Sequence, residues 1–383
     1  KGEGGVSRYF SQRFAQVTNP PLDSIREADG MTLRVALGPK PNISENSNHQ
    51  IIIKSPILQP QQLLQIYQQD FLRVANVDTL FTPNFDDAQA NQQQLQEKLI
   101  AIADQVEALA REHYDIIVLS DLGVSHQLAA VPAQLAIAAV NQRLIKQGLR
   151  FTTSLIYQTG QAASTHDIAC LLGFGASAVC PITVFNRAKQ LFEGLDAIAN
   201  GLNYFQKAVE KALMKTMGKF GLCTVESYIG GEFFEANFID TQDPILAELF
   251  PNIHSPVGGA RFADLADSAI EWHQKVFSIQ SENQIPVLGL FKERAEGGGH
   301  SFGNTAIREY INMTEESIQY VDESEIDNQD QGVFLPEDNG YKDLGYQARS
   351  AEQIDNFVLT QAYRDFSQSL YVERNLRPAA LRD

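Results

Sequence analysis

Ser120 and Asp121 are the residues whose type and position are best suited to chemistry in this chain. They follow the apolar run 116–119, which is typical of a strand buried on both faces. Barrel enzymes place their working groups at the carboxyl ends of such strands, where a carboxylate could orient a ligand or a neighbouring loop. The alternative, which we favour, is that Asp121 accepts the backbone N–H groups of the turn 123–125.

Two histidines, His126 and His166, follow the ends of adjacent predicted strands. They could approach each other, as a general acid or a metal pair would require. Neither has a second ligand at a fixed spacing, and His166 comes just after Ser164 and Thr165 at a predicted helix start. These features favour a solvated or capping-region histidine over a catalytic one.

The three cysteines, Cys170, Cys180 and Cys223, fit neither a disulfide framework nor the ligand spacing of a metal or an iron–sulfur cluster. We predict that they are buried free thiols, because free cysteine is among the most buried residue types. The glycines 173 and 175 do not continue as a phosphate-binding motif and are typical of a helix-to-strand loop.

The elements that must position these residues are read from the stretch 114–181. After the strand that ends at Ser120, apolar residues spaced four, three and four apart predict a helix that starts at Pro132 and runs to Gly148. The residues 151–157 predict the next strand. Strands joined by a helical crossover must be parallel, so the sequence predicts an α/β fold with a parallel sheet that curves into an incomplete or irregular barrel.

Further elements follow from the same patterns, most clearly an amphipathic helix around 95–109. The other predicted helices are 9–15, 61–71 and 185–217, the last broken near Gly194 and Gly201, and the other predicted strands are 49–55, 76–81 and one near 179. On one face of the last helix, Lys211, Lys215 and Lys219 form a basic stripe that we expect to pair with local carboxylates or to contact another domain.

Two regions differ in pattern, which predicts two domains. Residues 1–285 form the barrel-like domain with an N-terminal junction loop. Residues 286–383 lose the strand–helix alternation and form a mixed helical and loop extension, with an apolar run at 287–291 and a helical pattern over 351–374.

Acidic residues outnumber basic ones, 47 to 30, which gives a net charge of −17. This balance argues against nucleic acid and anionic membrane surfaces as partners. The sequence contains neither a membrane-spanning apolar stretch nor the apolar centre of a signal peptide, so we expect a soluble intracellular protein.

Long blocks of the sequence resemble a known family. The blocks are RFAQVTNPPLDSIRE at 13–27, SDLGVS at 120–125, HDIACLLGFGASAVCP at 166–181, KTMGKFGLCTVESYIGGEFFEA at 215–236 and PAALRD at 378–383. In this order they resemble the central domain of large-subunit glutamate synthases from end to end. The family usually has asparagine where this chain has Cys180.

The resemblance implies a multidomain enzyme that makes L-glutamate from L-glutamine and 2-oxoglutarate, in the cytoplasm or, in a plant or alga, the plastid stroma. The partners of this domain would be an amidotransferase domain and an FMN domain of the same enzyme, which also carries an iron–sulfur cluster and takes electrons from ferredoxin or NADPH. This fragment would hold no cofactor, would be inactive alone, and would end about where the flavin barrel begins.

The same resemblance implies that the domain is a noncatalytic linker and forms part of the route by which ammonia passes between active sites. Free ammonia would be protonated and lost to solvent, so such a route must exclude water. The junction loop at 13–27 is our candidate for it, through Gln16, Thr18, Asn19, Pro20 and Asp23. Two alternatives remain, an independent barrel enzyme that uses Asp121 and His166 and a stand-alone scaffold that binds a protein partner.

Overall fold

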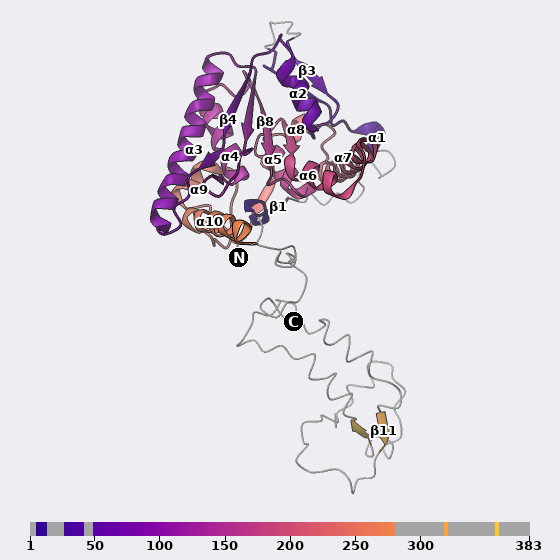
Figure 1. Cartoon of the computed structure of the whole chain (residues 1–383). Coiled ribbons are helices and arrows are strands. Elements are labelled where there is room, and N and C mark those ends of the chain that lie inside the picture. Colours follow the sequence, from indigo (N-terminus) through magenta and orange to yellow (C-terminus); the bar gives the residue numbers. More distant parts are fainter. Residues whose placement is uncertain (1–4, 14–26, 42–48, 280–317, 321–356, 360–383) are drawn as a thin grey trace. The chain divides into compact units, whose positions relative to one another are not determined.

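The computed structural model describes residues 5–13, 27–41, 49–279, 318–320 and 357–359 (Figure 1). The chain divides into two compact units, Lys1–Pro286 and Val287–Asp383. The assignment of residues 286–383 to a mixed extension stays a prediction, because most of them lie outside the described residues.

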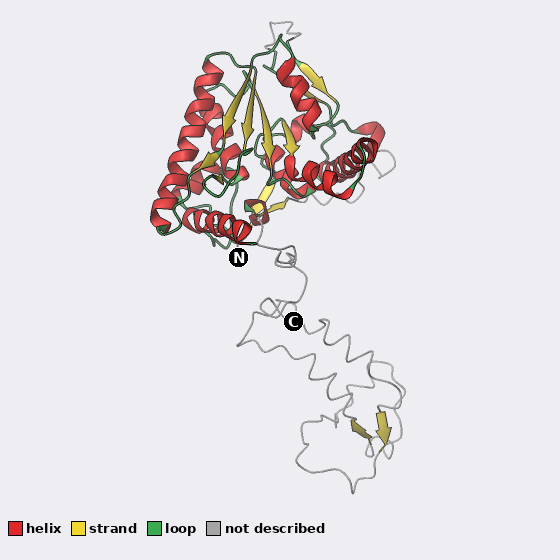
Figure 2. Ribbon diagram, viewed as in Figure 1, coloured by secondary structure: helices red, strands yellow, loops and turns green. Residues whose placement is uncertain are grey.

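The first unit is built on a four-stranded parallel sheet with the strand order β4-β6-β8-β9 (Figure 2). These strands are β4 Val74–Asp78, β6 Ile116–Ser120, β8 Ser154–Thr159 and β9 Ala178–Pro181. All residues of β6 are buried, as its unbroken apolar run predicts. The predicted α/β fold with a parallel sheet is therefore confirmed, and the described strands do not close into a barrel.

Three helices connect the strands of this sheet: α3 Ala88–Arg111, α4 Ala133–Lys146 and α5 Thr165–Gly173. Because the strand order follows the chain and such crossovers are right-handed, the three helices lie on the same face of the sheet. The predicted stripe of α3 is buried, and Asp87 caps the helix by accepting the N–H of Ala90 at 3.0 Å.

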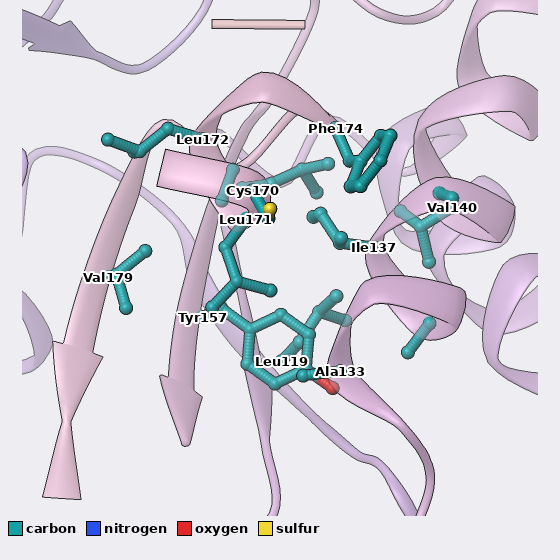
Figure 3. Close-up of a cluster of buried hydrophobic side chains, with 14 of the residues drawn as sticks. Leu119, Ala133, Ile137, Val140, Tyr157, Cys170, Leu171, Leu172, Phe174 and Val179 are labelled. Carbon is teal, nitrogen blue, oxygen red and sulfur yellow. The ribbon is translucent and has the colours of Figure 1, made fainter. Parts of the chain in front are cut away.

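The core lies between this helical layer and the sheet (Figure 3). Leu119 of β6 and Tyr157 of β8 are fully buried, and Ile137 of α4 and Leu171 of α5 cover them from the helical layer. Burying each such large apolar side chain stabilises the fold by roughly 1.5–3 kcal/mol. The sheet is thereby held rigidly enough to fix the loops at its carboxyl edge.

Smaller elements surround this body. The helices are η1 Val6–Tyr9, α1 Glu27–Gly30, α2 Pro60–Gln68, α6 Ile182–Leu191, α7 Leu195–Gly218, α8 Val225–Tyr228, α9 Pro244–Leu249 and α10 Phe262–Ser278. Three antiparallel pairs are β1 Phe10–Gln12 with β10 Phe234–Ala236, β2 Val35–Leu37 with β3 Ile51–Ile53, and β5 Leu80–Phe81 with β7 Ala129–Ala130.

Three predictions about the helices and strands of this unit are wrong. The predicted helix at 9–15 begins as a 3-10 turn and strand, because Phe10 packs among the rings of Phe174 and Phe250 and the chain there pairs with β10. The strand expected at 151–157 begins only at Ser154. Gly194 does separate α6 from α7, but Gly201 lies inside α7.

In the second unit the described residues are β11 Ile318–Tyr320 and β12 Phe357–Leu359, which pair antiparallel. The helical pattern predicted over 351–374 is therefore wrong at 357–359. The apolar run 287–291 lies outside the described residues. Across the described part of the chain, no helix combines the length and the hydropathy that a membrane span requires.

Candidate functional site

Asp121 lies at the carboxyl edge of the sheet, directly after β6, and is 4% exposed. Its carboxylate accepts the hydroxyl of Thr159 at 2.5 Å, the N–H of Gly160 at 2.9 Å and the side-chain amide of Gln161 at 3.1 Å. The first donor is the last residue of β8, and the other two begin the loop after this strand. The expected role in the turn 123–125 is therefore wrong, and Asp121 instead orients a neighbouring loop.

Ser120 takes part in the same edge through a different partner. Its hydroxyl donates to the Oε1 of Gln158 at 2.8 Å, and its oxygen accepts the N–H of Leu122 at 3.2 Å. Ser120 and Gln158 are register partners in the pairing of β6 with β8. The two predicted strand-end residues are thus adjacent, and both bind β8 or its loop.

Gln161 extends this network to the start of α4. The sequence reasoning did not predict this role of Gln161. Its Oε1 accepts the N–H of Ala133 at 3.0 Å, and its Nε2 donates to the carbonyl of Val131 at 2.9 Å. Pro132, the residue before α4, carries no side-chain cap, so Gln161 supplies the capping acceptor from another strand end. The available signal was the polar run 158–161 at the end of a predicted strand.

Burial governs the electrostatics of this edge. Desolvation raises the pKa of Asp121, although its three hydrogen bonds act to lower it. Desolvation also raises the pKa of Tyr157, with the charge of Asp121 as a second cause. A carboxylate that is enclosed and hydrogen-bonded in this way is suited to holding the loop after β6 against the end of β8 and the loop that follows it.

His166 lies elsewhere, on the first turn of α5, where Ser164 provides the N-cap. Its Nε2 lies 2.9 Å from the carbonyl oxygen of Ser7 and 3.5 Å from the Sγ of Cys170. The partners of His166 are therefore distinct from those of Asp121. A shared catalytic role for the two residues stays a prediction.

His126 belongs to a third group of residues. It contacts the rings of Phe85 and Phe277, at 5.9 and 5.7 Å between centroids, and its carbonyl lies 3.3 Å from the Nε2 of His273. The structure therefore does not bring His126 and His166 together. In the described part of the chain, His, Cys, Asp and Glu side chains form no group of three that could hold a metal ion.

The cysteines differ from one another in burial. Cys170 and Cys180 are buried, and desolvation raises the pKa of both thiols, to about 12 for Cys180. Cys223 is exposed, so the prediction of a buried thiol is wrong for this residue. It lies between α7 and α8, in a segment whose backbone pairs at Thr32.

Glu232 is a second buried carboxylate, 6% exposed, in the loop before β10. It accepts the side-chain amides of Gln142 at 2.6 Å and Asn252 at 2.8 Å, and desolvation raises its pKa. Its backbone has a φ of 50°, a left-handed conformation that is rare outside glycine. Glu232 joins three separate segments in the way Asp121 joins its loops.

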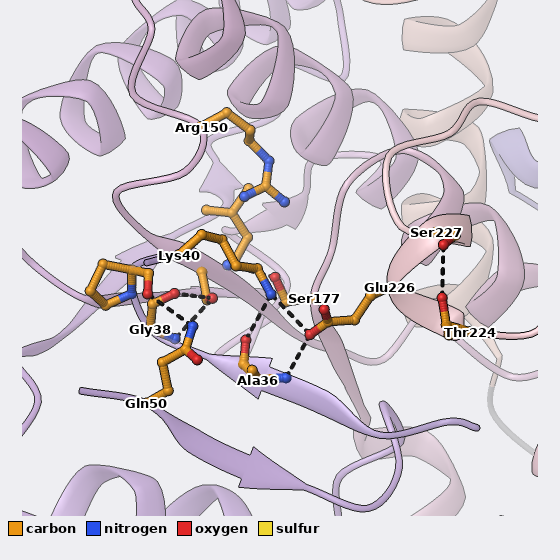
Figure 4. A network of polar contacts seen from close by, with 12 residues as sticks. Ala36, Gly38, Lys40, Gln50, Arg150, Ser177, Thr224, Glu226 and Ser227 are labelled. Carbon is orange, nitrogen blue, oxygen red and sulfur yellow. Dashed lines mark hydrogen bonds and ion pairs between the residues drawn. The ribbon is translucent and has the colours of Figure 1, made fainter. Parts of the chain in front are cut away.

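A polar network also lies at the amino ends of the strands (Figure 4). The hydroxyl of Ser154 accepts the N–H of Gly38 at 3.0 Å and donates to its carbonyl at 3.1 Å. Arg150 donates to the side chain of Asn141 and to the carbonyls of Thr153 and Gly175. Desolvation lowers the pKa of Arg150 to about 10.

The remaining predicted residues have no contacts that test them. Lys211, Lys215 and Lys219 take part in none of the ion pairs found among the described residues. The junction-loop candidates lie outside the described residues, and they are Gln16, Thr18, Asn19, Pro20 and Asp23.

Comparison with known proteins gives a family match over most of the chain. The family model for the glutamate synthase central domain matches residues 2–239. The ferredoxin-dependent glutamate synthase of Cyanidium caldarium is 38% identical over 309 residues, which cover 76% of this chain and 20% of that protein. Ferredoxin-dependent glutamate synthase 1, chloroplastic/mitochondrial, of Arabidopsis thaliana is 32% identical over 311 residues, 76% of this chain and 19% of that protein.

The chain thus spans about a fifth of the length of the curated relatives it matches. Among solved structures, a mutant flavocytochrome b2 with pyruvate bound matches with a TM-score of 0.38 and 9% identity, over 75% of this chain and 85% of that chain. A likeness at this level supports no inference about this chain.

Proposed function

The chain belongs to the glutamate synthase central-domain family, and from this premise we propose that it is a noncatalytic linking domain. In the parent enzyme it joins a glutamine amidotransferase domain to an FMN domain and forms part of the ammonia route between them. The parent enzyme makes L-glutamate from L-glutamine and 2-oxoglutarate, and the names of the relatives favour ferredoxin as its electron donor.

The observation that carries the noncatalytic role is the state of Asp121. A general acid or base must reach a substrate proton within hydrogen-bond distance. The Asp121 carboxylate is instead buried and occupied by Thr159, Gly160 and Gln161. The strand-end position that barrel enzymes use for chemistry is used here to fix the geometry of the loops.

The described cysteines also do not fit the iron–sulfur cluster of the parent enzyme. An iron–sulfur cluster needs cysteine thiolates that converge on one point. Cys170 and Cys180 are buried thiols with raised pKa values, and Cys223 is exposed in a different segment. We therefore assign the cluster to another part of the parent enzyme, and we propose that FMN is bound by its FMN domain, in the cytoplasm or, in a plant or alga, the plastid stroma.

The junction loop is our candidate for a wall of the ammonia route because its two flanks are fixed. On one side, the N–H of Arg13 donates to the carbonyl of Phe233 at 3.0 Å, and Gln12 accepts the hydroxyl of Tyr228 at 2.9 Å. On the other side, α1 packs against α7. A segment held at both ends can present its side chains at a domain border, here through Gln16, Thr18, Asn19, Pro20 and Asp23.

The test is a chimera in which this chain replaces the matching region of the Cyanidium caldarium enzyme. We expect ferredoxin-dependent glutamate formation with close to one ammonia transferred per glutamine hydrolysed. Gln16→Leu should lower this coupling while synthesis from added ammonia is unchanged, and Gln105→Leu on the exposed side of α3 is the matched control.

Three outcomes would contradict the proposal. Unchanged coupling in Gln16→Leu and Asn19→Leu, separately and combined, would remove the junction loop from the route. Flavin absorbance or turnover by the isolated chain would favour the alternative of an independent barrel enzyme with a site near Asp121. Partner binding without support of glutamate synthesis in the chimera would favour a stand-alone scaffold.

A further inference from the structure

A groove of about 720 Å³ lies between β3, α2 and α7, away from the carboxyl edge of the main sheet. Its volume is within the usual range of ligand sites. Five consecutive residues, 51–55, form one wall. Since successive side chains of a strand point to opposite faces, a wall that includes all five is formed by the edge of the strand.

The contacts of Ala36 show in which direction the backbone groups of β3 point (Figure 4). Ala36 faces Ile52 across the β2–β3 pair, but its N–H donates to Glu226 at 2.8 Å and its carbonyl accepts the ammonium of Lys40 at 3.2 Å. Both groups thus point away from β3. In an antiparallel ladder, the N–H and C=O of Ile52 must then also point outward, toward the groove.

This arrangement leaves the backbone of Ile52 free to pair. Neither its N–H nor its carbonyl has a hydrogen-bond partner among the described residues, and its side chain is 46% exposed. An unpaired strand edge is a template for another strand, whereas the outer edge of β2 is already occupied by Glu226 and Lys40.

The opposite wall carries side-chain amides at matching intervals. Gln62, Gln65 and Gln69 lie on one face of α2 and its end, and all three line the groove. Seven residues of helix advance about 10.5 Å, and three residues of strand advance about 10 Å. The row of glutamine side chains on α2 is therefore about as long as the free edge of β3.

These amides differ in availability. Gln69 is fully used in closing the turn after α2, through bonds to Ile66, Phe71 and Leu72. Gln62 uses only its oxygen, which accepts the N–H of Gln59 at 2.8 Å. The side-chain amide of Gln65 has no partner among the described residues, so it offers both a donor and an acceptor to the groove.

We propose that this groove binds an extended peptide strand by strand addition, with an acidic side chain of the peptide next to Lys54. The added strand pairs with Ile52 on one edge, and Gln65 and the free N–H groups of Gln62 meet its second edge. Two charged residues line the groove, Lys54 and Glu210. Glu210 accepts the side-chain amide of Gln206 at 2.9 Å, whereas Lys54 is exposed at the strand wall and takes part in no ion pair among the described residues, so a peptide side chain next to Lys54 should carry a carboxylate.

This inference concerns a different face from the proposed function and does not depend on it. The probe is a heptapeptide of alternating threonine and valine with one central glutamate and an N-terminal fluorescein, titrated with the full chain and followed by fluorescence anisotropy. We expect saturable binding that weakens at least tenfold when alternate peptide amides are N-methylated, because methylation removes the donors of strand pairing without changing the protein.

Variants on the exposed surface test the two walls without disturbing the core. Gln65→Ala should weaken binding several-fold, whereas Gln61→Ala, one exposed helix position outside the groove, should not. Lys54→Glu should weaken the glutamate peptide at least tenfold and improve binding of the matching lysine peptide, and Lys189→Glu is the charge-matched control.

Three results would overturn the proposal. The first is no binding at millimolar peptide, and the second is equal affinity for the N-methylated peptide. The third is self-association of the chain in sedimentation that Lys54→Glu abolishes, which would make a second copy the occupant of the groove.

Discussion

Removing the carboxylate of Asp121 should destabilise the unit Lys1–Pro286 by about 3 kcal/mol. In Asp121→Ala the buried hydroxyl of Thr159 loses its acceptor, at a cost of about 1–3 kcal/mol for an unsatisfied buried group. The donors on Gly160 and Gln161 lie nearer to solvent, where water can replace the lost acceptor, so each adds at most about 1 kcal/mol.

Asp121→Asn separates the hydrogen bonds from the charge. Burial raises the pKa of Asp121 above its ordinary value of 3.8, so between these two values the folded state holds more protons than the unfolded state. The contribution of Asp121 to stability is then greatest below pH 3.8 and falls as the pH rises through this window. Asparagine does not titrate, so its deficit relative to the wild type should shrink as the pH rises above about 4.

Urea unfolding followed by the fluorescence of Trp272, the one tryptophan of the chain, reports on this unit. The exposed Asp70 provides matched controls, since Asp70→Ala and Asp70→Asn should change the free energy of unfolding by no more than about 0.5 kcal/mol. If Asp121→Ala were as stable as Asp70→Ala, the strand-end network would not hold these loops together. A deficit of Asp121→Asn that grows with pH would refute the role of burial.

Three further results are expected. Glu232→Gln should gain free energy of unfolding relative to the wild type as the pH rises above about 4.3, because burial raises the pKa of Glu232. The control Glu235→Gln, at an exposed position, should show no such gain, and parallel urea titrations across pH check both variants. Gly173→Ala should lower the free energy of unfolding by about 1–3 kcal/mol in the same assay, because the added Cβ would lie 2.4 Å from the ring of Phe234. This overlap outweighs the better helix propensity of alanine, and a variant of equal or greater stability would show that the ring moves aside. Of the described thiols, a thiol reagent should modify only Cys223 in the folded chain and the two buried cysteines after unfolding, and mass spectrometry of labelled peptides would expose any early modification of the buried pair.

The fold was predictable where a pattern depends on one partner surface. The stripe of α3 needs only an apolar sheet face, and the buried run 116–119 needs only neighbours on both sides, so period and length were sufficient. The parallel sheet then followed from connectivity alone. Its strand order is that of the chain.

Predictions failed where a distant partner decides the local structure. The segment after Tyr9 was predicted as helix from local pattern, but Phe10 pairs with Ala236 and enters an aromatic cluster with Phe174 and Phe250. Strand propensity depends on such cross-strand contacts more than on the residues themselves. No local pattern identifies a partner more than two hundred positions away.

The strand-end site shows the same limit at the level of single side chains. Local reasoning paired Asp121 with its own turn, since Asx turns are the commonest nearby solution. The register Ser120↔Gln158 instead places the loop after β8 against the carboxylate. Only that register makes Thr159, Gly160 and Gln161 simultaneous partners, so the type of residue was predictable but its role was not.

The two buried carboxylates support one interpretation of the domain. Asp121 accepts uncharged donors from the end of β8 and the loop after it, Glu232 accepts uncharged donors from Gln142 and Asn252, and burial raises the pKa of both carboxyl groups. An ionised carboxylate in such a place costs stability unless every donor is held in position, so each network ties together loops that would otherwise move independently. In this domain two buried carboxylates fix the loops, and the strand edge at Ile52 stays unpaired. Such a domain is suited to positioning other protein segments.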